Sequence, residues 1–176
     1  MICEYATSAS AGKVYVYGLT LISQKNLWYY VYNGHGDVVK YFNASETVLK
    51  SYEYDAFGEE VDPSTSDTNP FRYAGQYYDT ENGTYYLRAR YYSPALGRFT
   101  QRDQHWNTGN MLYGDDSLML SMYVAKPDIL AILQSSNLYV YCIGNPVNQI
   151  DITGFWTVNI SISLSPVFGS GVSFSF

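Results

Sequence analysis

The chain has 176 residues, enough for one ordinary domain that buries about 70% of its unfolded surface. Hydrophobic residues make up 47% of the sequence and charged residues 15%, a balance that predicts an ordered core and excludes a disordered tail. The formal net charge of −6 argues against binding to a phosphate backbone, which needs a cationic face, so we predict no nucleic-acid partner.

The sequence carries no sign of export, membrane insertion or metal binding. Its first residues, MICEYATSASAGK, lack the basic flank and the apolar run of a signal peptide, and nowhere do about 18 apolar residues follow one another. Cys3, Cys142, His35 and His105 are isolated, with no second ligand at metal-binding spacing. We therefore expect no signal peptide, no membrane span, no metal and no cofactor.

Tyrosine is the unusual residue, with 20 copies, and it favours the half-buried surfaces of strands. YVYNGHG (30–36) and YEYDAFG (52–58) share the pattern Tyr-x-Tyr-x-x-x-Gly at an offset of 22 residues, and YVYG (15–18) is a fainter copy. Tyrosines two apart lie on one face of a strand, and glycine permits the positive φ of a turn. The repeat predicts β hairpins over residues 1–69.

Turn-forming residues divide the middle of the chain. DPSTSDTNP (62–70) predicts a surface loop. After it, the Asn82-Gly83 pair stands between two aromatic runs and predicts a tight hairpin. SPALGRF supplies a further turn, and Phe99 begins another short strand.

One segment predicts a helix. PDILAILQSSN begins with Pro and Asp and spaces Ile129, Ile132 and Leu133 as in a short amphipathic helix near residues 127–136. NLYVYCIGNPVNQID then returns to a strand and an Asn-Pro turn, and TVNISISLSPVFGSGVSFSF alternates apolar residues with Ser or Asn as a strand does. The fold class predicted from these patterns is all-β, mainly antiparallel hairpins, with one short helix.

Cations are concentrated in RARYYSPALGRFTQRDQ (88–104), which holds four arginines and then Asp103. An active site and a structural seam would both have this composition. Taken by itself, Asp103 fits a turn residue or a salt-bridge partner of Arg102, and Asp151 fits a side chain that satisfies its own turn. Arginines on aromatic strands commonly lie flat on rings and pair with carboxylates as part of the structure.

Three long motifs decide the family to which the sequence is similar. YEYDAFGE, PFRYAGQYYDTENGTYYLRARYYSPALGRFTQRD and NLYVYCIGNPVNQIDITG resemble, in this order, the Rhs or YD-repeat family and its C-terminal Rhs-repeat-associated core. The core match covers residues 70–155, with YD-repeat-like hairpins over 1–69 and a short variable tail over 156–176. The resemblance implies that the chain is part of a hollow β shell, as in polymorphic toxins and the C subunits of insecticidal toxin complexes, and that the core closes one end of it.

The resemblance also implies chemistry, because cores of this family often act as intramolecular aspartyl proteases. Two carboxylates that share a proton let one activate water while the other polarises the scissile carbonyl. Asp103 and Asp151 match the paired aspartates of the family, and Arg90 matches its assisting arginine. The expected cut lies between Phe155 and Trp156.

Two departures from the family pattern bear on this expectation. The residue after the second aspartate is usually proline, whose fixed φ would help to set the path of the strand, and here it is Ile152. Only 21 residues follow the expected cut, fewer than the roughly 50 that an independent domain needs. We therefore expect the released product to be a short Ser-rich amphipathic peptide.

Two other functions stay open. The chain could be a non-enzymatic carbohydrate- or wall-associated β module whose tyrosines stack on glycans, or an orphan toxin-tip remnant without activity. The partners expected are the remainder of an Rhs/YD-repeat shell and, for the second function, glycans. The expected location is secreted or at the cell envelope, as part of a larger protein.

Overall fold

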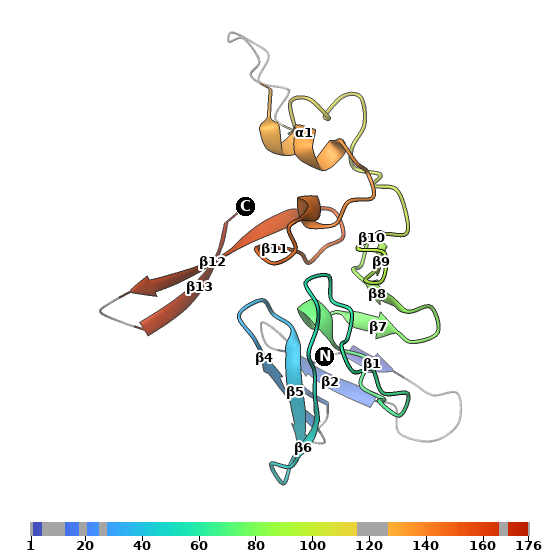
Figure 1. Cartoon of the computed structure of the whole chain (residues 1–176), viewed down its shortest axis with the longest axis vertical. Coiled ribbons are helices and arrows are strands. Elements are labelled where there is room, and N and C mark those ends of the chain that lie inside the picture. The colour runs from blue at the N-terminus through green and yellow to red at the C-terminus, as the bar shows by residue number, and fades with distance from the viewer. Residues whose placement is uncertain are drawn as a thin grey trace. The chain divides into compact units, whose positions relative to one another are not determined.

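The computed structural model of the chain describes residues 2–4, 13–17, 21–24, 28–115, 127–165 and 169–175. The chain divides into two compact units, Met1–Tyr78 and Asp79–Phe176 (Figure 1). The division falls within strand β7 (Tyr77–Asp79), a few residues after the predicted start of the core at residue 70. That predicted boundary stays a prediction.

Six antiparallel strands form one sheet in the first unit: β1 (Ile2–Glu4), β2 (Lys13–Tyr17), β3 (Leu21–Gln24), β4 (Trp28–Tyr32), β5 (Val38–Asn43) and β6 (Val48–Ser51). Their order in the sheet is their order in the chain, so neighbouring strands are joined as hairpins. The prediction of β hairpins in this part of the chain is confirmed.

One hydrogen-bond pattern recurs in the turns of this sheet. The side chain of Asn33 accepts hydrogen bonds from the backbone N–H groups two and four residues later, at 3.0 and 2.9 Å. Asp55 accepts the same two bonds, both at 2.9 Å, in the second copy of the repeat. Gly36 and Gly58 close these turns at φ 91° and 85°, which is why the repeat ends on glycine. The fainter copy (15–18) lies on β2 up to Tyr17, and Gly18 falls outside the described residues.

A third copy of the turn was not predicted. Asn43 accepts from the backbone N–H groups of Ser45 and Thr47, both at 3.0 Å, as Asn33 and Asp55 do in their turns. The residue in the glycine position is Glu46, at φ 60°. A search for the terminal glycine therefore misses this turn, although its backbone has the same conformation.

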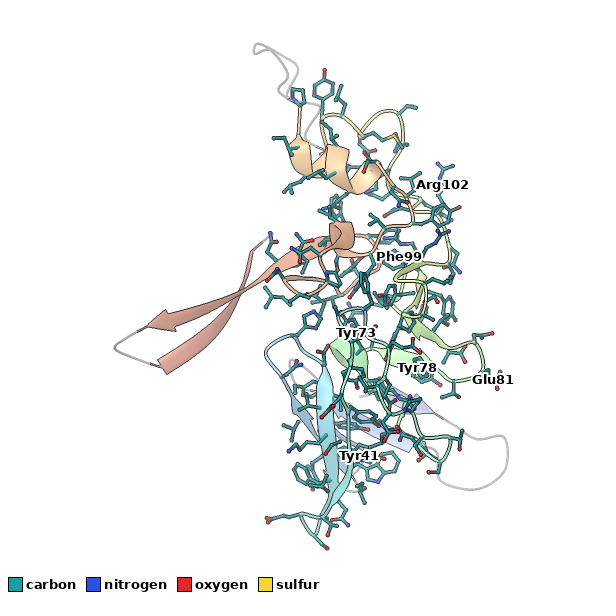
Figure 2. The ribbon with its side chains drawn as sticks, viewed as in Figure 1. Tyr41, Tyr73, Tyr78, Glu81, Phe99 and Arg102 are labelled. Carbon is teal, nitrogen blue, oxygen red and sulfur yellow. The ribbon has the colours of Figure 1, made fainter. Side chains whose placement is uncertain are left out.

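Aromatic rings fill the core of the first unit. Val38, Tyr41, Tyr52 and Phe71 are buried together (Figure 2). The ring of Tyr41 stacks on that of Tyr52, with centroids 6.1 Å apart. Of the repeat tyrosines, Tyr52 is buried in this core, and Tyr30, Tyr32 and Tyr54 are partly buried against it.

A charge-balanced cluster is buried beside this core. Arg72 lies 2.9 Å from Glu60 and 3.2 Å from Asp67, and Lys50 contacts the same two carboxylates. The hydroxyl of Tyr52 donates to Asp67 at 2.6 Å. Two cations thus face two carboxylates, which compensates the cost of burying them.

The remaining described strands form two sheets. The first has the order β10-β9-β8-β7, where β8 is Thr84–Tyr86, β9 is Tyr91–Ser93 and β10 is Arg98–Phe99. The second has the order β11-β12-β13, with β11 at Gln149–Asp151, β12 at Thr157–Ser165 and β13 at Gly169–Ser175. Gly83 closes the turn between β7 and β8 at φ 66°, so the predicted hairpin is confirmed.

The residues predicted as a tail are strands of the sheet that holds Asp151. β11 pairs with β12, with Asp151 opposite Thr157, and β12 pairs with β13 from Asn159 to Ser165 (Figure 1). The alternating sequence therefore forms two strands where one was predicted. Its serine side chains beyond Ile160 lie outside the described side chains.

Helix α1 (Ile129–Ser135) confirms the single predicted α-helix, and the side chain of Asp128 caps its first turn by accepting from Leu130 N–H at 2.9 Å. Its packing differs from an ordinary amphipathic helix. Ala131 is the buried residue, whereas Ile129 is 69% exposed. Two short 3-10 helices, η1 (Tyr73–Gly75) and η3 (Cys142–Gly144), were not predicted, because each contains a non-glycine residue with positive φ. No helix among the described residues has the length and apolar character needed to cross a membrane.

Candidate active site

Asp103 is placed by an irregular segment that follows β10. Its backbone N–H donates to the carbonyl of Leu138 at 2.8 Å, and Phe99 N–H donates to the carbonyl of Tyr139 at 2.9 Å, so the two segments run together. The ring of Tyr92 packs on that of Tyr141, with centroids 4.1 Å apart, and anchors this contact in the core. The carboxyl group of Asp103 is consequently buried, with the residue 3% exposed.

Asp151 is the last residue of β11 and closes the turn that follows. Its Oδ1 accepts from Thr153 N–H at 3.0 Å and from Gly154 N–H at 2.7 Å. Its Oδ2 is free of these bonds and lies 3.6 Å from Nη2 of Arg90. The expectation that Asp151 satisfies its own turn is therefore true of one oxygen only.

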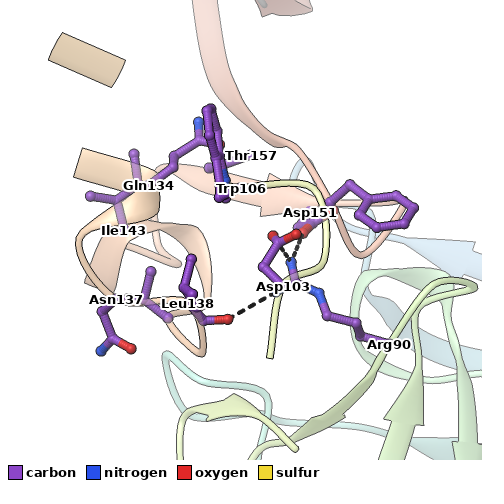
Figure 3. A pocket seen from close by; sticks show the side chains of 11 residues that line it. Arg90, Asp103, Trp106, Gln134, Asn137, Leu138, Ile143, Asp151 and Thr157 are labelled. Carbon is purple, nitrogen blue, oxygen red and sulfur yellow. Dashed lines mark hydrogen bonds and ion pairs between the residues drawn. The ribbon is translucent and has the colours of Figure 1, made fainter. Parts of the chain in front are cut away.

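Arg90 joins the two aspartates (Figure 3). Its Nη2 lies 2.9 Å from Oδ2 of Asp103 and 3.6 Å from Oδ2 of Asp151, so both carboxylates reach one nitrogen atom. Its Nη1 donates to the carbonyl of Leu138 at 3.3 Å, and its Nε donates to the carbonyl of Gly154. The guanidinium also lies over the ring of Phe99, 3.6 Å from the centroid.

The structure therefore brings together the three residues that the family resemblance selected. Asp103 and Asp151 are 48 residues apart in the chain, and no spacing rule would have paired them. The alternative partner of Asp103 expected from the sequence, Arg102, has no ion pair to it among those of the described residues, whereas Arg90 does.

The site holds more negative than positive charge. One guanidinium faces two buried carboxylates, unlike the cluster of the first unit, where Arg72 and Lys50 balance Glu60 and Asp67. Burial raises the pKa of Asp151 to about 6, although the Gly154 N–H and Arg90 oppose the rise. An excess buried carboxylate of this kind can hold a proton near neutral pH.

A small cavity opens beside these groups. It leaves room for about one water molecule. Asp103, Asp151, Arg90, Trp106, Phe155 and Thr157 are among its lining residues (Figure 3). Phe155 and Thr157 are the neighbours of Trp156 on either side, so residues next to the bond expected to be cut line this cavity.

Aromatic side chains pack on Trp156, the residue after the expected cut. The ring of Trp156 meets the ring of His105 edge-on, with centroids 4.3 Å apart, and the ring of Trp106 at 5.6 Å. The backbone N–H groups of Phe155 and Trp156 both lie within hydrogen-bond distance of the Thr153 hydroxyl, at 3.3 and 3.4 Å. His105 and Trp106, which follow Asp103 closely in the chain, thus contact Trp156.

Some residues at the site were not predicted. Trp106 and the Leu138 carbonyl belong to it, and Gly154 is required by it, because a Cβ there would lie 2.6 Å from the carbonyl oxygen of Leu87. The proximity of Trp106 to Asp103 in the sequence was the available signal. Ile152, in the usual place of proline, is half-buried and continues the chain from β11 into the turn.

The histidines and cysteines lie away from a metal-type arrangement. His35 contacts Asp37 at 2.8 Å and His105 contacts Asp115 at 3.2 Å. Cys142 is buried and unoxidised. Across residues whose placement is described, no three His, Cys, Asp or Glu side chains come together as metal ligands would.

Comparison with known proteins identifies the family. The model of the teneurin YD-shell family matches residues 5–126. The tRNA3(Ser)-specific nuclease WapA of Bacillus spizizenii is 35% identical over 152 residues, which are 82% of this chain and 6% of the relative. The chain belongs to the Rhs/YD-repeat family. Its predicted family membership and fold class are confirmed.

Two further comparisons give a sequence match over a shorter stretch and a structural match to the fold. Toxin protein Tse5 of Pseudomonas aeruginosa is 53% identical over 34 residues, 19% of the chain and 3% of the relative. The crystal structure of TcdB2-TccC3 superposes with a TM-score of 0.57 at 20% identity, over 82% of this chain and 7% of that one. The chain spans only about 6% of the length of the WapA proteins it matches.

Proposed function

We propose that this chain closes an Rhs/YD-repeat shell and cuts its own backbone between Phe155 and Trp156 as an intramolecular aspartyl protease. The observation that carries the proposal is the convergence of Asp103 and Asp151 on one nitrogen of Arg90, beside a cavity that Phe155 lines. A purely structural role would need the ion pair of Arg90 with Asp103, but a second, uncompensated carboxylate would add no stability.

The two aspartates take different roles. Asp103 lies closer to the guanidinium, at 2.9 Å, and acts as the ionised base. Asp151, whose pKa burial raises to about 6, carries the shared proton. Their environments differ in the way that separates an acid from a base in a carboxylate pair.

The reaction then proceeds by addition and elimination. Water in the cavity loses a proton to Asp103, and its oxygen forms a bond with the carbonyl carbon of Phe155 while Asp151 protonates the carbonyl oxygen. The carbon–nitrogen bond then breaks, and the proton on Asp103 passes to the nitrogen of Trp156. Asp151 recovers its proton as the new carboxyl group forms at Phe155.

Arg90 and the turn 151–154 would align the scissile bond. The guanidinium bonds the Gly154 carbonyl, one residue before Phe155, and the close approach of Gly154 to the backbone of Leu87 and Arg90 restrains this turn. Alignment of this kind supplies part of catalysis by itself. Ile152 can replace proline here because tertiary contacts hold the turn.

The test is the mass of the 176-residue chain, measured under denaturing conditions after folding. We expect loss of residues 156–176 in the wild type and an uncut chain for Asp103→Asn and Asp151→Asn. The matched control is Asp128→Asn, because asparagine also caps helices well and Asp128 lies outside the cavity. An uncut wild-type chain at every pH between 4 and 8 would remove the protease proposal.

The wider role follows from the family. We propose that the partner of this chain is the remainder of an Rhs/YD-repeat shell and that the parent protein acts outside the cell or at its envelope, in line with the toxin named Tse5. The tRNA nuclease activity in the name of WapA belongs to a protein of which this chain matches about 6%, and a net charge of −6 does not suit tRNA binding here.

Binding of glycans stays a prediction with less support. Six of the tyrosines expected to stack on sugars are buried, and so are closed to a ligand: Tyr41, Tyr52, Tyr73, Tyr85, Tyr92 and Tyr141. Inactivity of an orphan toxin tip also stays a prediction, and the mass measurement above would distinguish it from a working protease.

A further inference from the structure

Trp106 carries a buried polar group that the mechanism so far leaves unused. The residue is 2% exposed, and its indole Nε1 is fully buried with no hydrogen-bond partner among the described residues. Buried N–H groups are almost always paired, since leaving one unpaired costs free energy. An exception at a candidate active site calls for a functional explanation.

The indole lines the cavity that contains Asp103, Asp151 and Phe155 (Figure 3). Arg90 could also donate to the carbonyl oxygen under attack, but each of its three nitrogen atoms already contacts another carbonyl or carboxylate oxygen. The indole N–H of Trp106, a residue that lines this cavity, is by contrast an uncharged donor with no partner among the described residues.

The position of Trp106 is set from both sides. On one side, His105 donates its backbone N–H to Oδ1 of Asp103 at 2.8 Å, which ties this segment to the aspartate. On the other, the ring of Trp106 packs edge-on against Trp156, with centroids 5.6 Å apart. Trp106 thus follows a residue that is bonded to Asp103 and contacts Trp156, the residue after the expected cut.

We propose that Nε1–H of Trp106 donates a hydrogen bond to the carbonyl oxygen of Phe155 as negative charge develops on it during attack by water. The inference rests on the proposed function. The N–H stays bonded to its nitrogen throughout, and the proton that the oxygen receives still comes from Asp151. A donor placed where charge develops, in a largely buried site, stabilises the transition state more than the ground state.

The sharpest test removes the donor and keeps the shape of the ring. Trp106 is replaced by 3-benzothienylalanine, in which sulfur stands in place of the N–H group, and the same analogue at Trp28 serves as the matched control. Trp28 packs on Tyr41 in the first unit and does not line the cavity. The full 176-residue chains are unfolded in denaturant, diluted to start folding, and followed by denaturing mass spectrometry. A second pair of variants, Trp106→Phe and Trp28→Phe, repeats the comparison with natural residues.

We expect the analogue at position 106 to slow cleavage about 100-fold or more, as loss of one such donor does elsewhere, with an unchanged melting temperature. The analogue at position 28 should cut at the wild-type rate. Equal slowing at both positions, or wild-type cleavage by both, would overturn the role of Trp106 and leave the protease proposal standing. A wild-type chain that never cuts would overturn the protease proposal and this inference together.

Discussion

Gly154 lies so close to the backbone of Arg90 that a side chain at position 154 would clash with its neighbours. The Gly154 carbonyl accepts from Nε of Arg90, and a Cβ added at Gly154 would lie 3.0 Å from the Arg90 nitrogen and 2.6 Å from the Leu87 carbonyl oxygen. This contact joins the turn after β11 to the segment before β9. It also determines where the next residue, Phe155, can lie.

We expect Gly154→Ala to abolish cleavage and to destabilise the second unit. Gly144→Ala is the matched control, because both glycines have φ 76° but a Cβ at Gly144 meets nothing within 4 Å. Both variants bear the strain of a left-handed alanine, about 1 kcal/mol, and only Gly154→Ala adds the clash. The measurements are cleavage by mass and unfolding in denaturant. Equal effects of the two substitutions would contradict the account of this contact.

The rate of cleavage should depend on the protonation of Asp151. Its pKa of about 6 predicts that the proton it donates is present at pH 5 and lost by pH 8, so cleavage slows as pH rises through this range. The measurement is the rate of cleavage after refolding at several pH values. Histidine titrates in the same range, so the profile is repeated with His105→Asn. A profile that disappears in this variant would assign the dependence to His105 instead.

Stability should change with pH for the same reason. The pKa of Asp151 is higher in the folded chain than the ordinary value of about 3.9, so its contribution is fully present below that value and is lost as pH rises through 6. We expect the free energy of unfolding of uncut Asp103→Asn to fall by about 2 kcal/mol between pH 4 and pH 7 from this group. Adding Asp151→Asn should remove that part of the slope, and an unchanged slope would contradict the assigned pKa.

The third turn, from Asn43 to Thr47, predicts a stabilising substitution in the first unit. Glu46 adopts φ 60°, a conformation that costs a non-glycine residue about 1 kcal/mol. We expect Glu46→Gly to be about 1 kcal/mol more stable than Ser45→Gly, because Ser45 is not among the residues with positive φ and both variants add the same flexibility to the unfolded chain. Equal melting temperatures for the two variants would show that the turn is not strained.

These turns also show how far the sequence predicts the fold. Tyr-x-Tyr-x-x-x-Gly identified two turns because glycine marks the left-handed position. The third turn has Glu46 in that position and is held by the local hydrogen bonds to the side chain of Asn43. Ala74 and Ile143 also adopt positive φ, inside η1 and η3, and no local pattern indicated them.

The candidate site could be predicted only in part. The family motifs selected Asp103, Asp151 and Arg90, whereas residue chemistry alone favoured separate structural roles for each. The proposed role of Trp106 depends on an unpaired, buried N–H of a residue that lines the cavity, which is a property of the packed chain. The different roles proposed for the two aspartates likewise depend on burial and on the distances of their oxygens to Arg90.

The strand pairing predicts that a cut chain stays together. β12 and β13 remain hydrogen-bonded to β11 on the other side of the expected cut. We expect native mass spectrometry of cut protein to give the mass of the whole chain plus one water, and denaturing conditions to give two pieces. Spontaneous loss of the peptide 156–176 under native conditions would contradict this expectation.

Cleavage in water labelled with ¹⁸O tests the central claim most directly. Refolded wild-type chain should give a large fragment that ends at Phe155 and carries one ¹⁸O atom in its new carboxyl group, and a peptide whose first residue is Trp156. Asp103→Asn and Asp151→Asn should give neither fragment. A chain that stays whole, or one that is cut at the same bond when either aspartate is replaced, would contradict the role assigned to the carboxylates at Arg90.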